Sequence, residues 1–276
     1  MQQEGCTMSG AGGLEQNSHR AAMITLEDLE NMTEHQASDS AYNSHGRLQE
    51  EPEPMENEEQ ERLLEYWQRV GRGHQVDVPR DMAEPIQQLT RNNHPQERER
   101  VPFKLLSRKE KHGKVLYEKR QYGKAKWACI KMEEKQYEQS TCLAFMKIMK
   151  YICEQNSAGL YLGMTIPILT TVHINETQSE LTNSVTVAYY LPSQYQEQPP
   201  QPSDSDIIIE DWPPTVVYAR TFSGATNENI IMQQISLLAE LLESPELCLQ
   251  DTFIVAAYTN PGAADRQNEI WLLQRP

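Results

Sequence analysis

Long apolar runs and paired cysteine motifs are both missing from the sequence. A membrane-spanning helix needs about 18 or more consecutive apolar residues, and no run of that length occurs in this chain of 276 residues. The five cysteines are odd in number and none forms a Cys-x-x-Cys pair, which argues against a disulfide framework and a zinc knuckle. A charged and then apolar leader is missing as well. We therefore expect a soluble, cytoplasmic protein with free thiols.

Familiar catalytic and phosphate-binding motifs are missing too. No Gly-x-Gly-x-x-Gly lies between a predicted strand and a predicted helix, and neither a Gly-x-x-x-x-Gly-Lys loop, a Gly-x-Ser-x-Gly elbow nor a His-Glu-x-x-His pair occurs. Five of the seven histidines precede residue 98, so His112 and His173 alone remain for acid–base chemistry in the rest of the chain. The sequence therefore favours a protein that is not an enzyme, with a small-molecule hydrolase as the weaker alternative.

Charge is distributed unevenly along the chain. Residues 1–98 carry 19 acidic and 8 basic residues, a net charge of −11, whereas residues 99–127 carry a net charge of +7. The remaining residues are again acidic and would repel phosphate, so the basic segment indicates a solvated strand face rather than a nucleic-acid site. Because the first segment is acidic and polar, it can bury too little apolar surface to offset chain entropy. We predict that residues 1–98 form a disordered acidic tail.

One short stretch of this tail has an amphipathic pattern. Apolar side chains recur at helical spacing from Leu63 to Val70, and Gly71-Arg72-Gly73 would end the helix. Two interpretations remain open, a transient helix without a partner and a motif that docks on another protein.

The region after residue 98 repeats one pattern of elements. Alternating β-formers predict strands within 115–132, in either one bent strand or a pair, and an apolar stripe predicts a helix over about 138–154. Two strands follow, over 160–173 and 184–191. After a proline-rich link, a strand is predicted over 215–222, a helix over 230–242, and two strands over 252–258 and 269–274, joined by the turn Asn260-Pro261-Gly262.

This order predicts a duplicated unit of strand, helix, strand and strand. Short turns favour antiparallel pairing, and each helix has one apolar stripe with which to cover a sheet. The predicted fold class is α+β, with residues 99–276 as the folded domain.

Five strings in the C-terminal region resemble one protein family by their order and spacing. They are YEKRQYGKAKW at 117–127, GMTIPI at 163–168, PPQP at 199–202, IED at 209–211 and NEIWL at 268–272. With these strings, residues 101–276 resemble the SOUL heme-binding protein family, in particular its SOUL-type branch. The resemblance implies a twisted, barrel-like antiparallel sheet flanked by two helices. It also implies a shallow apolar site for heme or another tetrapyrrole in a cytosolic protein that is not an enzyme.

Heme needs an apolar surface for the macrocycle and cations for its propionates. The first helix could supply both, with Phe145, Met146 and Met149 beside the ring and Lys147 or Lys150 beside a propionate. The resemblance implies that this helix contributes to the porphyrin pocket, with Phe145 at the position of a pocket methionine, Cys142 at that of a propionate-facing arginine, and the lysine kept at Lys150. The competing interpretation is that these apolar residues form core against the sheet.

Iron ligation departs from the pattern of the resemblance. Relatives that ligate heme by a histidine carry it at the position of Gln121, and a glutamine amide is a poor iron ligand. We therefore expect non-covalent heme binding without that histidine, with His112, Cys129 and His173 as weak substitutes.

A function from another class remains open as an alternative. The same fold would serve as a protein-interaction module that has lost heme affinity and contacts partners through the acidic tail or the second helix. Some relatives are proposed to present a death-promoting BH3-like stretch there, with Ile231, Ile235, Leu238 and Leu242 as anchors. Because Pro245 breaks the expected ending, core packing of this helix is the favoured interpretation.

Overall fold

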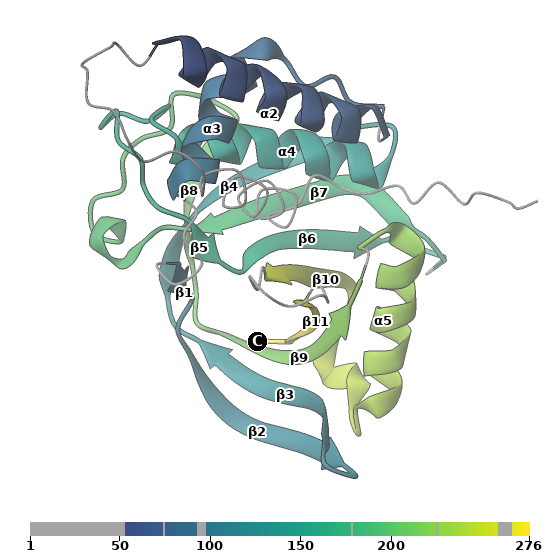
Figure 1. Cartoon of the computed structure of the whole chain (residues 1–276). Coiled ribbons are helices and arrows are strands. Elements are labelled where there is room, and N and C mark those ends of the chain that lie inside the picture. The colour runs from purple at the N-terminus through teal and green to yellow at the C-terminus, as the bar shows by residue number, and fades with distance from the viewer. Residues whose placement is uncertain (1–52, 74, 93–97, 178, 225, 259–266) are drawn as a thin grey trace, which may run out of the picture.

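The computed structural model describes residues 53–73, 75–92, 98–177, 179–224, 226–258 and 267–276, which form a mixed α+β structure (Figure 1). The described helices are α2 (Glu53–Gly73), α3 (Ala83–Asn92), α4 (Tyr137–Ile152) and α5 (Glu228–Leu241), with 3-10 turns η1 (Arg80–Met82), η3 (Ser193–Tyr195) and η4 (Pro245–Leu247). The strands of the main sheet are β2 (Phe103–Lys111), β3 (Lys114–Tyr122), β4 (Ala125–Glu133), β6 (Ile168–Ile174), β7 (Leu181–Tyr190), β8 (Ile207–Trp212), β9 (Thr215–Ser223), β10 (Cys248–Tyr258) and β11 (Gln267–Gln274). β1 (Glu99–Arg100) and β5 (Thr165–Ile166) form a separate parallel pair. The predicted α+β class is confirmed.

The main sheet is antiparallel and has the order β2-β3-β9-β11-β10-β6-β7-β4-β8. The predicted duplication is visible in it, as β4-α4-β6-β7 and β9-α5-β10-β11, and the two units meet where β6 pairs with β10. The preceding strands are exchanged, because β3 pairs with β9 of the second unit and β8 pairs with β4 of the first. The strands predicted within 115–132 are therefore two strands that do not pair with each other. The sheet curls but is not closed into a barrel, since β2 and β8 each end it.

Alternation along the strands gives the sheet two apolar faces. On β4, Ala128 and Ile130 join the large core cluster with α4 and α5, whereas Trp127 and Cys129 join a second cluster on the opposite face. We call the side covered by the helices the outer face and the other side the inner face. Residues of β3, near one end of the sheet order, share the second cluster with β4 and β7 near the other end. The sheet must therefore curl toward its inner face.

Local sequence explains where the two helices begin and end. At α5, the side-chain oxygen of Asn227 accepts a hydrogen bond from the Ile230 amide at 3.0 Å, a typical N-cap. At α4, Glu138 in the first turn and Lys150 in the last turn complement the helix dipole. The chain then turns at Asn156, whose side-chain amide donates to the Tyr151 and Leu160 carbonyls. Both predicted helices are thus confirmed within two residues or so of their bounds.

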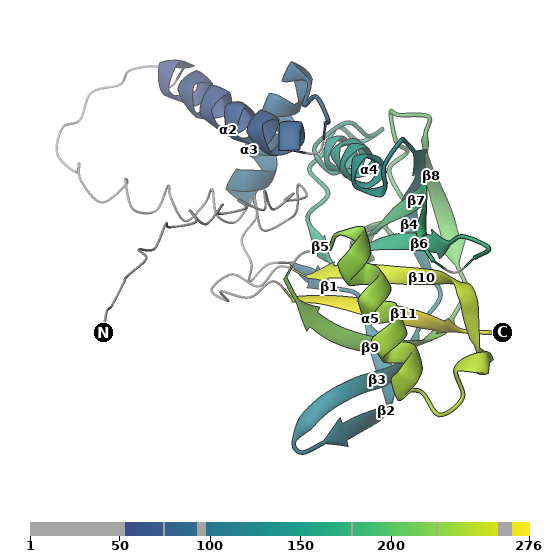
Figure 2. The ribbon, with the colours of Figure 1, turned by 90° about the vertical axis from the view of Figure 1, so that its right-hand side faces the viewer.

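Residues 53–92 correct the prediction of a disordered tail. They form α2, η1 and α3, which we call the N-terminal helical cap, and the cap lies on the side of α4 that faces away from the sheet (Figure 2). Trp67, Met82, Ile86 and Leu89 are all fully buried in the same core cluster as α4. The average composition is polar, but these apolar side chains recur at helical spacing and gather on one side. Residues 1–52, 74 and 93–97 of the predicted tail and the turn at 260–262 lie outside the described residues.

Candidate functional site

The predicted porphyrin-binding residues of α4 lie in its interior. Cys142, Phe145, Met146 and Met149 are at most 6% exposed, so the accessible apolar surface that was expected beside α4 is not present in this structure. The reason is that α4 lies between two layers, the sheet strands β4 and β7 on one side and the cap on the other. The prediction of an open surface here is therefore wrong for the capped chain.

Polar contacts identify the side of α4 that faces the cap. Gln139 donates to the Gln75 carbonyl at 3.4 Å, Lys150 Nζ lies 2.6 Å from Asp81 Oδ2, and the Cys153 thiol donates to the Pro85 carbonyl at 3.5 Å. At 100° per residue, Cys142 and Met146 lie on the same side of the helix as these three residues. Burial raises the pKa of the Cys153 thiol, so this sulfur is protonated and a poor iron ligand in the capped chain.

The cap is held together by its own polar pairs. On α2, the Gln60 side chain donates a hydrogen bond to Gln87 of α3 at 2.5 Å. The neighbouring Glu59 forms an ion pair with Arg91 of α3 at 2.8 Å. At the other end, Gln88 of α3 hydrogen-bonds to Glu154, which follows α4. The cap is thus a two-helix unit that contacts α4 mainly through η1 and α3.

The remaining predicted ligand residues are not brought together with α4. Gln121 is exposed on β3, and four strands lie between β3 and β7 in the sheet order. His112 is exposed at the β2–β3 turn, where it and Gly113 have positive φ values of 52° and 75°, as a type I′ hairpin turn requires. His173 is half-buried on β6, with Nδ1 3.1 Å from Thr252 Oγ1. Cys129 is buried on the inner face, where burial raises its pKa.

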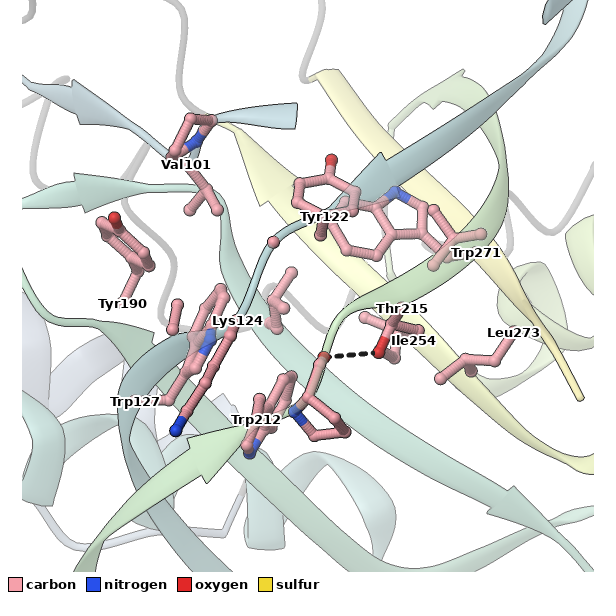
Figure 3. A pocket seen from close by; sticks show the side chains of 16 residues that line it. Val101, Tyr122, Lys124, Trp127, Tyr190, Trp212, Thr215, Ile254, Trp271 and Leu273 are labelled. Atoms are coloured by element: carbon pink, nitrogen blue, oxygen red, sulfur yellow. Dashed lines mark hydrogen bonds between the residues drawn. The ribbon is translucent and has the colours of Figure 1, made fainter. Parts of the chain in front are cut away.

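A second apolar site, which the sequence interpretation missed, lies on the inner face (Figure 3). Its volume is about 580 Å³, counting the part that is open to solvent. We call it the aromatic pocket because five aromatic residues line it, which are Tyr122, Trp127, Tyr190, Trp212 and Trp271. Tyr122 stacks on Trp271 with ring centroids 4.8 Å apart, and Trp127 stacks on Trp212 at the same distance. The curl of the sheet creates this site, since its residues come from β3, β4, β7, β8 and β11.

A buried ionic network supports one wall of the aromatic pocket. Glu269 accepts two hydrogen bonds of 2.8 Å from the Arg120 guanidinium, one from Tyr258 at 2.9 Å and one from the Trp271 indole at 2.7 Å. Burial alone would lower the pKa of Arg120, but the carboxylate of Glu269 raises it above its usual value. Burial alone would raise the pKa of the Glu118 carboxyl, but hydrogen bonds from Arg120 and Arg108 lower it below its usual value. Arg120 and Glu118 are therefore both charged and both paired within this network.

The side chains of α5 that were considered as groove-binding anchors are buried in the core. Ile231, Ile235 and Leu238 are 0%, 6% and 0% exposed and pack on the outer face, which confirms that they are core residues. Among the residues that the structure describes, no helix is long and apolar enough to cross a membrane, and no three His, Cys, Asp or Glu side chains are grouped as a metal site.

Comparison with known proteins identifies what the fold and sequence resemble. The family model described as SOUL heme-binding protein matches residues 98–273, and so begins just after the cap. Heme-binding protein 2 of Mus musculus is 33% identical over 162 residues, which are 58% of this chain and 78% of that protein. Heme-binding protein 1 of Sus scrofa is 31% identical over 174 residues, which are 63% of this chain and 91% of that protein. Among solved structures, the EcmrR C-terminal domain has a TM-score of 0.41 at 10% identity, covering 58% of this chain and 96% of that one.

Proposed function

Because the chain belongs to the SOUL heme-binding protein family, we propose that it binds heme or a related tetrapyrrole without covalent attachment. Relatives that are named heme-binding proteins support a binding role rather than a catalytic one. We place the site on the cap side of α4, where Cys142 and Met146 would contact the macrocycle, while Met149 and then Phe145 lie farther round the helix toward the sheet. On this proposal the protein acts in the cytoplasm as a carrier or sensor and not as an enzyme.

One observation supports this location of the site. The cap places apolar side chains and a carboxylate against α4, and a tetrapyrrole would place the same two kinds of group there. Its apolar side chains, with Ile86 and Leu89 among them, cover the helix, and the carboxylate of Asp81 pairs with Lys150. A tetrapyrrole would supply an apolar ring and propionate carboxylates. The cap therefore occupies this surface in place of a ligand, and binding requires its withdrawal.

The cap is suited to withdraw because its docking is incomplete. The indole nitrogen of Trp67 is buried without a hydrogen-bond partner in the structure, which costs about 1–3 kcal/mol. The ion pair between Asp81 of the cap and Lys150 of α4 is partly exposed, with 62% of the Asp81 side chain accessible to solvent. Such pairs contribute about 1 kcal/mol or less to stability. Since the ligand would bind only the uncapped chain, its apparent affinity falls with the uncapped fraction.

Withdrawal would also free the groups that a bound tetrapyrrole needs. Lys150 would lose Asp81 and meet a propionate. Lys147 lies one turn earlier, but it pairs with Asp206 at 2.5 Å outside the cap and would have to exchange that partner for a propionate. We propose that the iron takes no histidine ligand from this chain. Gln121 replaces the expected histidine on a distant strand, and neither His112 nor His173 shares a surface with the cap side of α4.

Hemin titration followed through the Soret band tests this function in the full-length chain. The informative variant is Trp67→Ala combined with Leu89→Ala, which removes two fully buried cap side chains and leaves α4 unchanged. Faster hydrogen exchange in α3 would verify that the cap has opened. We expect saturable hemin binding whose apparent affinity is at least about tenfold higher in this variant than in the wild type.

The matched control is Asn92→Ala, at an exposed position of the same helix α3, which should leave the affinity unchanged. If hydrogen exchange shows an open cap but hemin gives no saturable spectral change, the function is refuted. That outcome would favour the alternative, a protein-interaction module, in which the cap permanently fills the site. The complete burial of Leu89 and Trp67 is the observation that favours this alternative.

A further inference from the structure

We propose that the aromatic pocket is a second binding site, for a small, uncharged, planar molecule of one or two aromatic rings. It is independent of the tetrapyrrole site, because it lies on the inner face while α4 packs on the outer face. Its walls come from both repeats: Tyr122 and Trp127 precede α4 in the chain, and Trp212 and Trp271 belong to the second half (Figure 3). The central strands β6 and β10 contribute Leu169 and Ile254.

Two carboxylates hold two of the three indole rings of this pocket in place. Trp271 Nε1 donates to Glu269 Oε2 at 2.7 Å, and Trp212 Nε1 donates to Glu210 Oε2 at 2.9 Å. In both cases the glutamate precedes the tryptophan by two residues, so the two side chains lie on one face of a strand. Because each indole N–H already has an acceptor, both rings are oriented before any ligand arrives. Trp271 stacks on Tyr122 and is 2% exposed, so the half-buried Trp212 offers most of the indole surface. Such preorganised walls favour a flat apolar ligand.

The charges around the pocket exclude an ionic ligand. The one charged side chain of its lining, Lys124, pairs with Asp211 at 3.5 Å, and the carboxylate behind Trp271 pairs with Arg120. An ionic ligand would lose its hydration without gaining an unpaired counter-charge. The Thr215 hydroxyl donates to the Pro213 carbonyl at 3.0 Å, which leaves its oxygen as an acceptor. One donor on the ligand, such as a ring N–H, would complement it.

The size and the opening of the pocket set the ligand class. The volume of about 580 Å³ includes space that is open to solvent, and Trp127 and Trp271 are only 4% and 2% exposed. Other side chains thus cover most of both rings, and the small space that remains limits a ligand to one or two rings. Gly123 lies in the lining, and a Cβ atom built there would have no neighbour within 4 Å. A larger side chain at this exposed position would extend at the rim of the pocket without disturbing the core.

The test uses the ¹⁵N-labelled full-length chain and its indole N–H signals. Three of the four tryptophans line the pocket, and the fourth, Trp67, lies on α2 and serves as an internal reference. Three ligands share one bicyclic ring: indole is neutral, tryptamine is cationic and indole-3-acetate is anionic. We expect indole to shift the three pocket signals saturably and leave the Trp67 signal in place. Both charged analogues should bind at least about tenfold more weakly.

Two glycine variants separate the pocket from non-specific effects. Gly123→Leu should abolish the indole shifts, whereas Gly73→Leu, at another glycine whose added Cβ would meet no neighbour, should not change them. Hemin binding by the cap-opened chain should be unaffected by Gly123→Leu, which keeps this proposal separable from the proposed function. The proposal is overturned if indole causes no saturable shift, if Gly123→Leu leaves the shifts unchanged, or if a charged analogue binds as well as indole.

Discussion

The two repeats carry equivalent helices, yet α4 and α5 differ in how much of their surface is buried. In α4, 12 of 16 residues are buried, whereas in α5 only three of 14 are, and those three form a single stripe on the sheet. Gln233, Ser236 and Glu240 are exposed on the outer side of α5. The corresponding side of α4 is covered by the N-terminal helical cap. In each repeat, the side of the helix that faces the sheet is buried by the sheet itself. The opposite side of α4 is buried in addition, because residues 53–92 cover it.

This difference distinguishes two sets of contacts, those that join the two repeats to each other and those that hold the cap on α4. Exchanged strands and the Arg120–Glu269 pair join the two repeats to each other, because Arg120 lies on β3 and Glu269 on β11. The polar contacts described above between the cap and the body, by contrast, all go to α4 and the residues that follow it, in the first repeat. We therefore expect changes in the inner-face network to weaken the whole body, and changes in the cap to act locally.

The largest effect is expected from Glu269→Ala. It leaves the buried guanidinium of Arg120 without its bidentate partner and removes the acceptor of Tyr258 and Trp271, so the free energy of unfolding should fall by about 3–5 kcal/mol. Glu269→Gln keeps an acceptor and should cost less. Urea unfolding followed by circular dichroism measures both. A loss below about 1 kcal/mol for Glu269→Ala would contradict the role of this pair in joining the repeats.

The next largest effect is expected in the cap. Leu89→Ala removes a fully buried side chain from α3, which should destabilise the docked cap by about 2–5 kcal/mol. If the cap is a separate unit, hydrogen exchange will increase in α2 and α3, while β6, β7 and β10 keep their protection. Equal loss of protection in cap and sheet would show instead that the two form one cooperative unit.

A third prediction uses pH to compare the inner face with the surface. Burial raises the pKa of Tyr122 to about 12, whereas an unfolded tyrosine titrates at about 10. The neutral phenol thus stabilises the folded state fully below pH of about 10, and this contribution of about 2–3 kcal/mol is lost as the pH rises toward about 12. Tyr122→Phe should flatten the alkaline fall in stability measured by urea unfolding. Tyr195→Phe, at the half-buried η3 turn, is the control and should leave the slope unchanged.

The comparison of the two helices also explains what the sequence could predict. The apolar residues of α5 form one stripe, and the predicted helix and its buried anchors Ile231 and Leu238 are correct. On α4 the buried residues surround the helix, with Met146 on the cap side and Ile148 fully buried as well. A helix that is apolar on all sides requires a second cover. That signal was present, but the acidic average of residues 1–98 concealed the few apolar side chains that supply the cover.

The aromatic pocket depended on information that local patterns do not hold. Its residues come together because β3 and β8 are exchanged between the repeats and the sheet curls, and neither fact follows from strand periodicity. The same holds for Gln121, which the string around it could not place relative to α4. One local pattern, a glutamate two residues before a tryptophan, occurs at Glu210-Trp212 and Glu269-Trp271, but it also occurs at Glu65-Trp67 on α2 and so does not single out the pocket.

The smallest effect is expected from the ion pair that joins the cap to α4. Asp81→Asn removes the partner of Lys150 at an exposed position, so the docked cap should lose only about 0.2–1 kcal/mol. On the proposed function hemin competes with this carboxylate for Lys150, so the apparent affinity for hemin should rise about 1.4- to 5-fold. Asp77→Asn, at an exposed aspartate of the preceding loop, is the matched control and should change nothing. A fall in affinity for Asp81→Asn would mean that the carboxylate assists the ligand, and so that the cap forms part of the site.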